Sequence, residues 1–345
     1  MRPSRRRNVR ALPLALTLAS SLLLFGMATS RAEEINLYST REPQLVEPVV
    51  ASFTAATGIT VKLTYIEDNL VTRMKVEGDA SPADVLTTIG LDKTSQFAAN
   101  DLSQPTTSAL LHKAIPPQLR GREWISLSVR PRVVMVRNDS PQGAIRYEDL
   151  ADPRFRGQLC IRSPLHQNNV ALISAYLVHH GADATEAWLR GIKANLTYAP
   201  EGKDNDVIRQ LAEGRCSIGI ANTVALAQLR DGREGAEWTA WANKVKTVPT
   251  TFERRGTHVN LTGAALAKHA PHRAAALKFL EFLVTPPAQK LYAAAELEYP
   301  VTAGAESAPL VAAMGAFSSD TLDIDAISAS QKAAIALIKK VGFEK

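Results

Sequence analysis

Ser217-Ile218-Gly219-Ile220-Ala221-Asn222-Thr223-Val224-Ala225-Leu226-Ala227-Gln228-Leu229 is the stretch from which the fold can be argued. A short β-branched run ends at Asn222 and Thr223, after which Ala, Leu and Gln take over. This order predicts a buried strand, a turn and the start of a helix. Because open α/β sheets place ligands at the carboxyl ends of their strands, we expect Asn222 and Thr223 to face a ligand.

The same alternation of strand and helix runs through the rest of the chain. It predicts an α/β fold with a mainly parallel sheet. A second alternating series begins at Gly157, which indicates two similar lobes rather than one large sheet. Strands are expected over 35–39, 59–65 and 83–88, long extended segments over 125–136 and 259–263, and helices over 45–57, 70–77, 171–179, 273–283, 286–295 and 327–340.

The simplest topology has the chain cross to a second lobe near residue 132 and return near residue 262. Lobe 1 then comprises 33–131 plus 263–300, and lobe 2 comprises 132–262 plus 301–345. No repeat, low-complexity tract or long linker interrupts this arrangement.

Residues 1–32 have the pattern of a secretory signal peptide. Basic residues precede an apolar run, and a small-x-small site at Ser30-Arg31-Ala32 predicts cleavage after Ala32. An uncleaved anchor is the alternative, and the export route, general secretory or twin-arginine, is left open. Without its six leader arginines the chain carries 34 basic and 34 acidic residues. A neutral mature chain gives no compositional support to nucleic-acid binding.

The chain has two cysteines, Cys160 and Cys216, both at the starts of expected strands. Export permits a disulfide if these strands are neighbours, and two buried thiols are the alternative. Two cysteines without a nearby histidine cluster do not make a structural zinc site.

A set of short motifs is spread over almost the whole mature chain. The motifs are Leu37-Tyr38-Ser39-Thr40-Arg41, Ser81-Pro82-Ala83-Asp84-Val85, Arg130-Pro131-Arg132, Leu150-Ala151-Asp152-Pro153, Ile161-Arg162-Ser163, Ala221-Asn222-Thr223, Arg255-Gly256-Thr257-His258-Val259-Asn260 and Glu298-Tyr299-Pro300-Val301. In this order and spacing they resemble the periplasmic ferric-iron-binding proteins of ABC importers. The resemblance implies a two-lobed periplasmic-binding-protein fold of type II, with a hinge of crossing strands that lets the lobes close on a solute.

The tyrosines that hold Fe(III) in that family are replaced here. Fe(III) is a hard cation that needs anionic oxygen ligands. The family's adjacent tyrosine pair after Ala-Asn-Thr corresponds to Val224 and Ala225, which carry no donor atom. Val129, Asn168 or Asn169, and Glu42 stand at other positions where the family has a tyrosine or a histidine. His166 with Glu42 gives too few ligands for a replacement site, so no metal ligand is assigned.

Side chains suited to an anion remain at the expected strand ends. Hydroxyl, amide and guanidinium groups there add to the free N–H groups of helix N-termini. Ser163 and Asn222 could equally be helix caps, and Arg130 and Arg132 could equally form structural ion pairs. The predicted ligand-binding residues are Ser39, Thr40, Arg41, Glu42, Thr88, Arg130, Ser163, His166, Asn168, Asn222 and Thr223.

These observations predict a periplasmic solute-binding protein rather than an enzyme. The chain shows no Gly-x-Ser-x-Gly elbow, no His-Glu-x-x-His and no phosphate-binding glycine loop. The expected ligand is a small anionic solute, or Fe(III) as part of an anionic chelate, and the expected partner is an ABC permease in the inner membrane. The protein is expected to be a monomer. The alternatives are direct Fe(III) binding by unidentified ligands, and an exported enzyme or sensor subunit.

Overall fold

The computed structural model describes Met1 and residues 33–343. Contacts divide the chain into Met1–Arg31 and Ala32–Lys345, and the fold below is that of the second unit. The predicted signal peptide, 1–32, lies outside the described residues apart from Met1. No helix within 33–343 is both long enough and apolar enough to cross a membrane.

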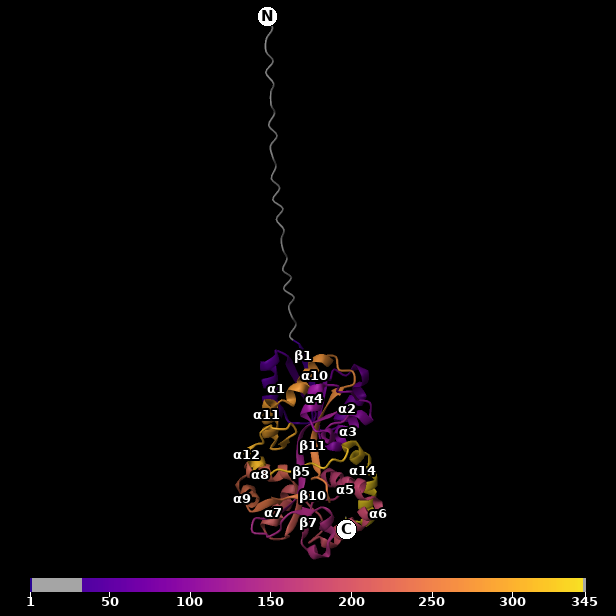
Figure 1. Cartoon of the computed structure of the whole chain (residues 1–345), viewed down its shortest axis with the longest axis vertical. Helices are drawn as coiled ribbons and strands as arrows, with labels where there is room; N and C mark the ends of the chain where they lie inside the picture. The colour runs from indigo at the N-terminus through magenta and orange to yellow at the C-terminus, as the bar shows by residue number, and fades with distance from the viewer. Residues whose placement is uncertain (2–32, 344–345) are drawn as a thin grey trace. The chain divides into compact units, whose positions relative to one another are not determined.

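One ten-stranded sheet runs through this unit, and two long strands connect its halves (Figure 1). The order is β2-β1-β3-β11-β5-β8-β7. The first half contains β1 (Glu34–Ser39), β2 (Thr60–Tyr65) and β3 (Val85–Ile89), which pair in parallel. The second half contains the parallel pair β7 (Leu159–Ile161) and β8 (Ile218–Asn222).

The connecting strands are β5 (Ile125–Arg137) and β11 (Val259–Ala267), which pair with each other and run antiparallel to their neighbours. The N-terminal part of β5 pairs with β11, and its C-terminal part pairs with β8. The expected α/β fold with a hinge of crossing strands is therefore confirmed. Short strands complete the structure: β4 (Ser103–Gln104) on β11, β9 (Val245–Val248) and β12 (Tyr299–Pro300) on β5, and a separate pair of β6 (Ile145–Arg146) and β10 (Thr250–Thr251).

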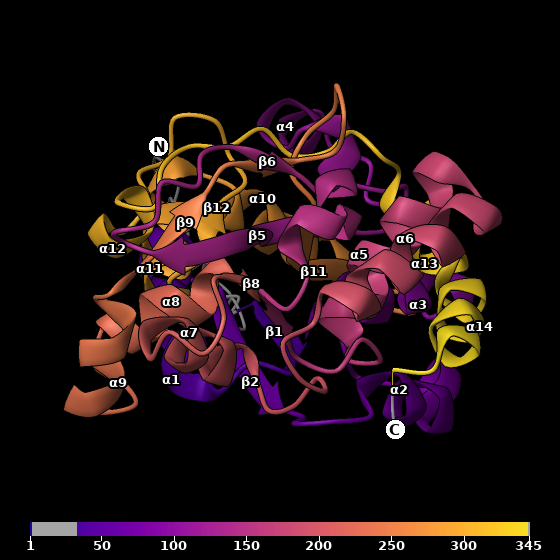
Figure 2. The same cartoon turned by 90° about the horizontal axis from the view of Figure 1, so that it is seen from below.

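Helices cover both halves of the sheet. In Figure 2, α7, α8 and α9 lie together on one side, and α5, α6 and α14 lie together on another. The helices are α1 (Pro43–Thr57), α2 (Leu70–Glu77), α3 (Leu91–Ala99), α4 (Ala109–Ala114), α5 (Gln167–His180), α6 (Ala182–Asn195), α7 (Asp204–Ala212), α8 (Thr223–Arg230), α9 (Ala236–Ala242), α10 (Arg273–Leu283), α11 (Pro286–Glu296), α12 (Pro309–Ala312), α13 (Ile324–Ala329) and α14 (Gln331–Val341).

Local chemistry explains several of these boundaries. Helix α1 begins with Pro43, whose fixed φ suits a first helical turn, and ends before Gly58, whose φ of 74° closes the helix in the left-handed conformation. The predicted helix over 273–283 matches α10. The single helix expected over 327–340 is wrong, because the segment is divided into α13 and α14 at Ser330, whose amide bonds back to Ala326 and Ile327.

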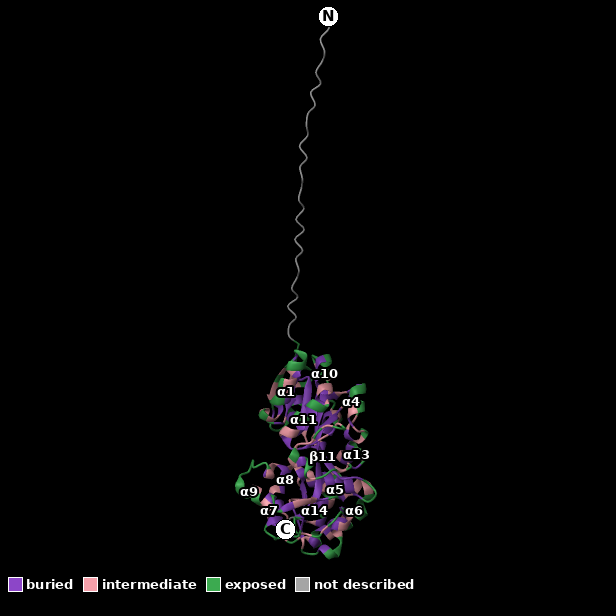
Figure 3. Ribbon diagram, turned by 60° about the vertical axis from the view of Figure 1, so that its left-hand side comes forward, coloured by how far each residue is buried: buried purple, intermediate pink, exposed green. Residues whose placement is uncertain are grey.

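The core lies between the strands and the inner faces of the helices, as the purple strands of Figure 3 show. Strands β3, β8 and β11 are buried almost throughout, as expected for strands covered on both faces.

Cys160 and Cys216 form a disulfide, with 6.0 Å between their Cα atoms. Cys160 lies in β7, and Cys216 stands two residues before β8, the parallel neighbour of β7. Because the two strands are adjacent, the pair is close enough to be bridged. The bond joins residues 56 positions apart within the second half of the sheet.

Candidate functional site

The carboxyl ends of β1 and β3 carry the first group of predicted ligand residues. Ser39 ends β1, and its buried hydroxyl accepts a hydrogen bond from the Arg41 amide at 3.0 Å. The Thr40 hydroxyl accepts from the Ile89 amide at 3.2 Å and donates to Thr88 at 3.5 Å. These bonds fix the two strand ends to each other. We call Ser39, Thr40, Arg41, Thr88 and Arg130 the first strand-end group.

Arg41 is buried in an ion-pair network of the chain itself rather than left free for an anion. Its guanidinium contacts Glu296, and it donates to Glu298 at 2.5 Å and to Thr262 at 2.7 Å. Burial alone would lower the pKa of Arg41, but Glu298 and Glu296 outweigh burial and raise it. The guanidinium therefore stays charged and already faces two carboxylates.

Arg130 joins the same network from β5. Its Nε lies 3.6 Å from Glu298, and a terminal nitrogen donates to the Leu261 carbonyl at 3.0 Å. Burial lowers the pKa of Arg130. Burial raises the pKa of Glu296 to about 7, whereas Arg41 and Arg130 overcome burial and lower that of Glu298. Above about pH 7, where Glu296 is also ionised, two arginines face two carboxylates and the network is close to charge balance.

Arg132, two residues further along β5, organises the carboxyl end of β8. It pairs with Asn222 across the strands, and its guanidinium donates to the Asn222 side chain at 3.1 Å. It also donates to Asp204 at 3.1 Å and to Asn169 at 2.8 Å. The side chain of Asn222 is therefore held by Arg132, and the backbone amide of Asn222 donates to the Asp204 carboxylate at 3.1 Å. We call Arg132, Arg162, Asp204, Asn222 and Thr223, with Ser163, His166 and Asn168, the second strand-end group.

Arg162 follows β7 and shares the carboxylate of Asp204 with Arg132. Its NH1 lies 3.8 Å from Asp204 Oδ1, and its Nε is buried without a hydrogen-bond partner. Burial lowers the pKa of Arg162. Burial would raise the pKa of Asp204, but Arg132 and Arg162 lower it. One carboxylate thus faces two guanidinium groups, which leaves an excess of positive charge.

His166 caps helix α5, because its Nδ1 accepts from the Asn168 amide at 3.2 Å. Burial and the charge of Arg162 lower the pKa of His166 to about 4. A neutral ring that accepts at Nδ1 carries its proton on Nε2. His166 therefore adds a hydrogen-bond donor, next to the N-terminus of a 14-residue helix. Ser163 is half-buried, and its hydroxyl accepts from the Leu165 amide at 3.3 Å.

Two of the predicted ligand-binding residues, Glu42 and Thr223, lie in surroundings unlike those of the others. Glu42 is exposed, and its carboxylate accepts from the side chain of Gln44. Thr223 is the buried first residue of α8 and lines a cavity of about 520 Å³ together with Pro131 and Arg255. Within 33–343, no side-chain hydrogen bond or ion pair joins the first strand-end group to the second. The structure brings the predicted residues together in two sets, one in each half of the sheet.

The side chains offer little to a bare metal ion. Among the described residues, no group of three or more His, Cys, Asp or Glu side chains is placed to hold one. The Tyr147 hydroxyl donates to the Arg132 carbonyl at 2.7 Å, and the Tyr299 hydroxyl to the Gly315 carbonyl at 2.9 Å. Tyr65, at the end of β2, is 39% exposed and is the tyrosine most open to solvent.

Sequence reasoning missed Asp204, Glu296 and Glu298 as partners of the arginines. Glu298 was noticed only as part of a motif, and Asp204 stands among Glu201, Asp206 and other acidic residues that give it no distinguishing pattern. Their roles depend on pairing between residues 42 to 257 positions apart. For Arg132, the alternative of a structural ion pair is the one that the structure shows.

Comparison with known proteins decides the family. The profile of the bacterial extracellular solute-binding proteins matches residues 36–295. The iron uptake protein A1 of Synechocystis sp. is 36% identical over 317 residues, which cover 90% of this chain and 88% of that protein. The chain belongs to the periplasmic ferric-iron-binding proteins. It is thus a periplasmic solute-binding protein of the transport type and not an enzyme.

Solved structures of this family share the fold. The Bordetella ferric binding protein has a TM-score of 0.88 and 43% identity, covering 91% of this chain and all of that one. The Trichodesmium iron-binding protein, solved in complex with iron and citrate, has a TM-score of 0.86 and 36% identity, covering 90% of this chain and all of that one. The two-lobed architecture is therefore that of the ferric-binding proteins.

Proposed function

We propose that this protein is the receptor of an ABC importer and captures ferric iron as a complex with an anionic chelator of the carboxylate class. The observation that carries this proposal is the sharing of Asp204 by Arg132 and Arg162, which leaves positive charge at the end of β7 and β8. Arginine forks suit carboxylates. The Trichodesmium relative was solved in complex with iron and citrate, which supports a ligand of this class.

The missing phenolates support a chelate over the bare ion. Val224 is half-buried and Ala225 is buried in the first turn of α8, and neither can donate to a metal. A chelator supplies the oxygen ligands that Fe(III) requires, and the protein then needs only to hold the chelator's negative charge.

Hinge closure is the expected mechanism. We infer that lobe 1, 33–131 plus 263–300, and lobe 2, 132–262 plus 301–345, close about β5 and β11, so that strand ends of both lobes contact the solute. The closed protein, a monomer freed of residues 1–32, then docks on the inner-membrane permease. The residues proposed to meet the solute are Ser39, Thr40, Glu42 and Thr88 from lobe 1, and Arg162, Ser163, His166, Asn168, Asn222 and Thr223 from lobe 2. Arg41 and Arg130 keep their ion pairs with Glu296 and Glu298 beneath this surface.

Direct binding of Fe(III) through lobe 1 is the second candidate, favoured by the exposure of Tyr65. Burial and the charges of Glu67 and Glu42 raise the pKa of Tyr65. A phenolate ligand must lose its proton, so this environment opposes iron binding by Tyr65 alone. The chelate is therefore the better supported ligand.

Calorimetric titration with ferric citrate, citrate and an unchelated ferric salt tests the proposal. We expect ferric citrate to bind and Arg162→Gln to weaken it roughly tenfold or more, because a hydrogen bond to a charged group is worth about 1.5–3 kcal/mol. Arg156→Gln, which changes an exposed arginine after η4 (Pro153–Phe155), is the matched control. Equal binding by the wild type and Arg162→Gln, or tight binding of Fe(III) without a chelator, contradicts the proposal.

A further inference from the structure

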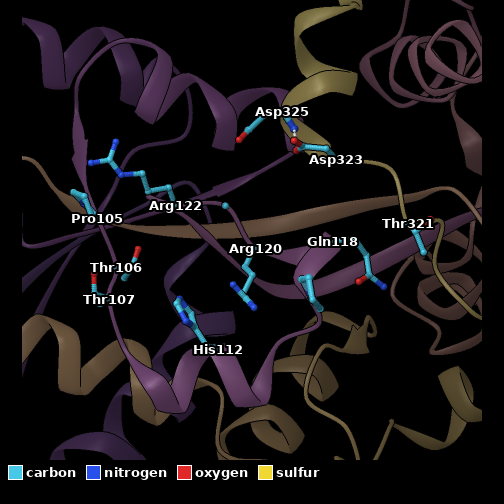
Figure 4. A pocket seen from close by; sticks show the side chains of 12 residues that line it. Pro105, Thr106, Thr107, His112, Gln118, Arg120, Arg122, Thr321, Asp323 and Asp325 are labelled. Carbon is cyan, nitrogen blue, oxygen red and sulfur yellow. Dashed lines mark hydrogen bonds between the residues drawn. The ribbon is translucent and has the colours of Figure 1, made fainter.

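A cavity of about 900 Å³ lies away from both strand-end groups. Its walls come from the loop between β4 and α4, from residues 117–122, and from the loop that leads into α13 (Figure 4). None of its lining residues belongs to the first or the second strand-end group. Whatever this cavity binds is therefore separate from the solute proposed above.

Thr106 gives the cavity a buried polar group without a partner. The residue is only 4% exposed, and its hydroxyl has no hydrogen-bond partner in the structure. Its amide is fixed by donation to the Arg122 carbonyl at 3.1 Å. A buried polar group left unpaired costs about 1–3 kcal/mol, so an occupant that bonds to this hydroxyl would recover that energy.

One wall is cationic. Arg120 is half-buried, and its Nε donates to the Ile115 carbonyl at 3.2 Å. Its terminal nitrogens meet no acceptor among the described residues, and no ion pair there includes Arg120 or Arg122. His112, in the last turn of α4, lies beside Arg120 in Figure 4. This wall presents the donors that a carboxylate needs.

The opposite wall is anionic. Asp323 caps α13, because its Oδ1 accepts from the Asp325 amide at 2.9 Å, and Asp325 Oδ1 accepts from the Trp124 indole at 3.1 Å. Neither carboxylate forms an ion pair among the described residues, and both are exposed at the rim. Both lie across the cavity from Arg120 and His112 (Figure 4).

We propose that this cavity binds a small zwitterion of the amino-acid class. Its carboxylate would lie against Arg120 and the Thr106 hydroxyl, and its ammonium group would face Asp323 and Asp325. A ligand with only a negative charge is attracted by Arg120 but repelled by the two aspartates. A ligand with only a positive charge is attracted by the aspartates but repelled by Arg120. A ligand with both charges satisfies both walls at once, which gives selectivity through repulsion of the singly charged alternatives.

Calorimetric titration of the purified protein tests this inference. The probes are glycine, γ-aminobutyrate and 6-aminohexanoate, which separate the two charges by increasing lengths, and acetate, methylammonium and phosphate. We expect at least one zwitterion to bind about tenfold more tightly than acetate, methylammonium and phosphate, the difference that one charge-assisted hydrogen bond makes. Binding of acetate or phosphate as tight as that of every zwitterion, or no binding of any zwitterion, overturns the proposal.

Two variants keep the test free of folding defects. Asp323→Asn retains a good helix cap and removes one rim charge. Thr106→Val removes the unpaired hydroxyl and should leave the melting temperature unchanged or raised. Each is expected to weaken the best zwitterion at least fivefold, whereas Arg156→Gln and Arg162→Gln, which lie outside the cavity, should bind it as the wild type does. Wild-type affinity in both cavity variants overturns the proposal, whatever the outcome with ferric citrate.

Discussion

Arg132 and Asp204 contact each other at 3.1 Å in the interior of the protein, where the side chain of Arg132 is fully buried and that of Asp204 is 7% exposed. The pair joins β5, which carries the chain between the two halves of the sheet, to the start of α7. Arg130, two residues earlier on β5, enters the network of Glu298 instead. One strand thus links two buried charge networks at the place where the halves of the sheet meet.

Removal of the Asp204 charge should destabilise the protein strongly. Asp204→Asn leaves the buried Arg132 and the half-buried Arg162 without a counter-ion, and breaking a buried pair from one side costs about 3–5 kcal/mol. Urea denaturation followed by circular dichroism measures the loss. Asp139→Asn is the matched control, because Asp139 pairs with Arg137 on the surface and water already screens that pair. Equal midpoints for the two variants would show that the buried pair does not stabilise the fold.

Loss of the disulfide should also lower stability, through the unfolded chain. Cys160 and Cys216 are separated by 56 positions. In the chain-entropy description, closing a loop of that length lowers the entropy of the unfolded chain and raises the free energy of unfolding by about 4 kcal/mol. The double variant Cys160→Ala/Cys216→Ala should therefore unfold at a lower urea concentration than the oxidised wild type. A reducing agent should move the wild type toward the variant and leave the variant unchanged. Identical midpoints in all three samples would contradict the expectation.

Much of the fold could be predicted from local pattern. The β-branched run before Asn222 and the alternating segment before Ser39 are strands because their side chains are buried in a sheet, and Gly58 ends α1 because it adopts a left-handed conformation. The break at Ser330 could not be foreseen, because the alanines on both sides of it favour a continuous helix. Packing of α13 and α14 against α5 determines the break instead.

The site was less accessible to sequence reasoning for a different physical reason. Hydroxyl and amide groups at strand ends follow from the fold and were predicted by position. Whether an arginine there is free or paired depends on distant residues, as the contacts of Arg41 with Glu296 and Glu298 show. Arg162 was part of a recognised motif, but only the geometry shows that it shares Asp204 with Arg132.

Acid should destabilise the protein partly through His166. Burial and Arg162 lower the pKa of His166 to about 4, below its usual value of 6.5. Between these values the unfolded chain binds a proton that the folded protein does not, so the contribution of His166 to stability is complete above about pH 6.5 and is lost as pH falls toward 4. His166→Asn keeps a residue suited to capping α5 and removes the titration. Thermal unfolding from pH 4 to pH 8 should show the wild type losing stability relative to this variant below about pH 6.5, with parallel curves above it. Stability curves of the wild type and the variant that stay parallel over the whole pH range would contradict the lowered pKa and mean that His166 is more solvated.

The colour of the iron-loaded protein tests the absence of phenolate ligands. With Val224 and Ala225 after Asn222-Thr223, ferric citrate held by the wild type should show no visible phenolate-to-iron charge-transfer band. Val224→Tyr places a phenol at the half-buried first turn of α8 without filling the core position of Ala225. This variant should acquire the band when ferric citrate is added, while Val76→Tyr, at an exposed position of α2, should stay colourless. A red wild-type protein would mean that a tyrosine such as Tyr65 reaches the iron after closure, and the chelate would then no longer be the whole ligand set.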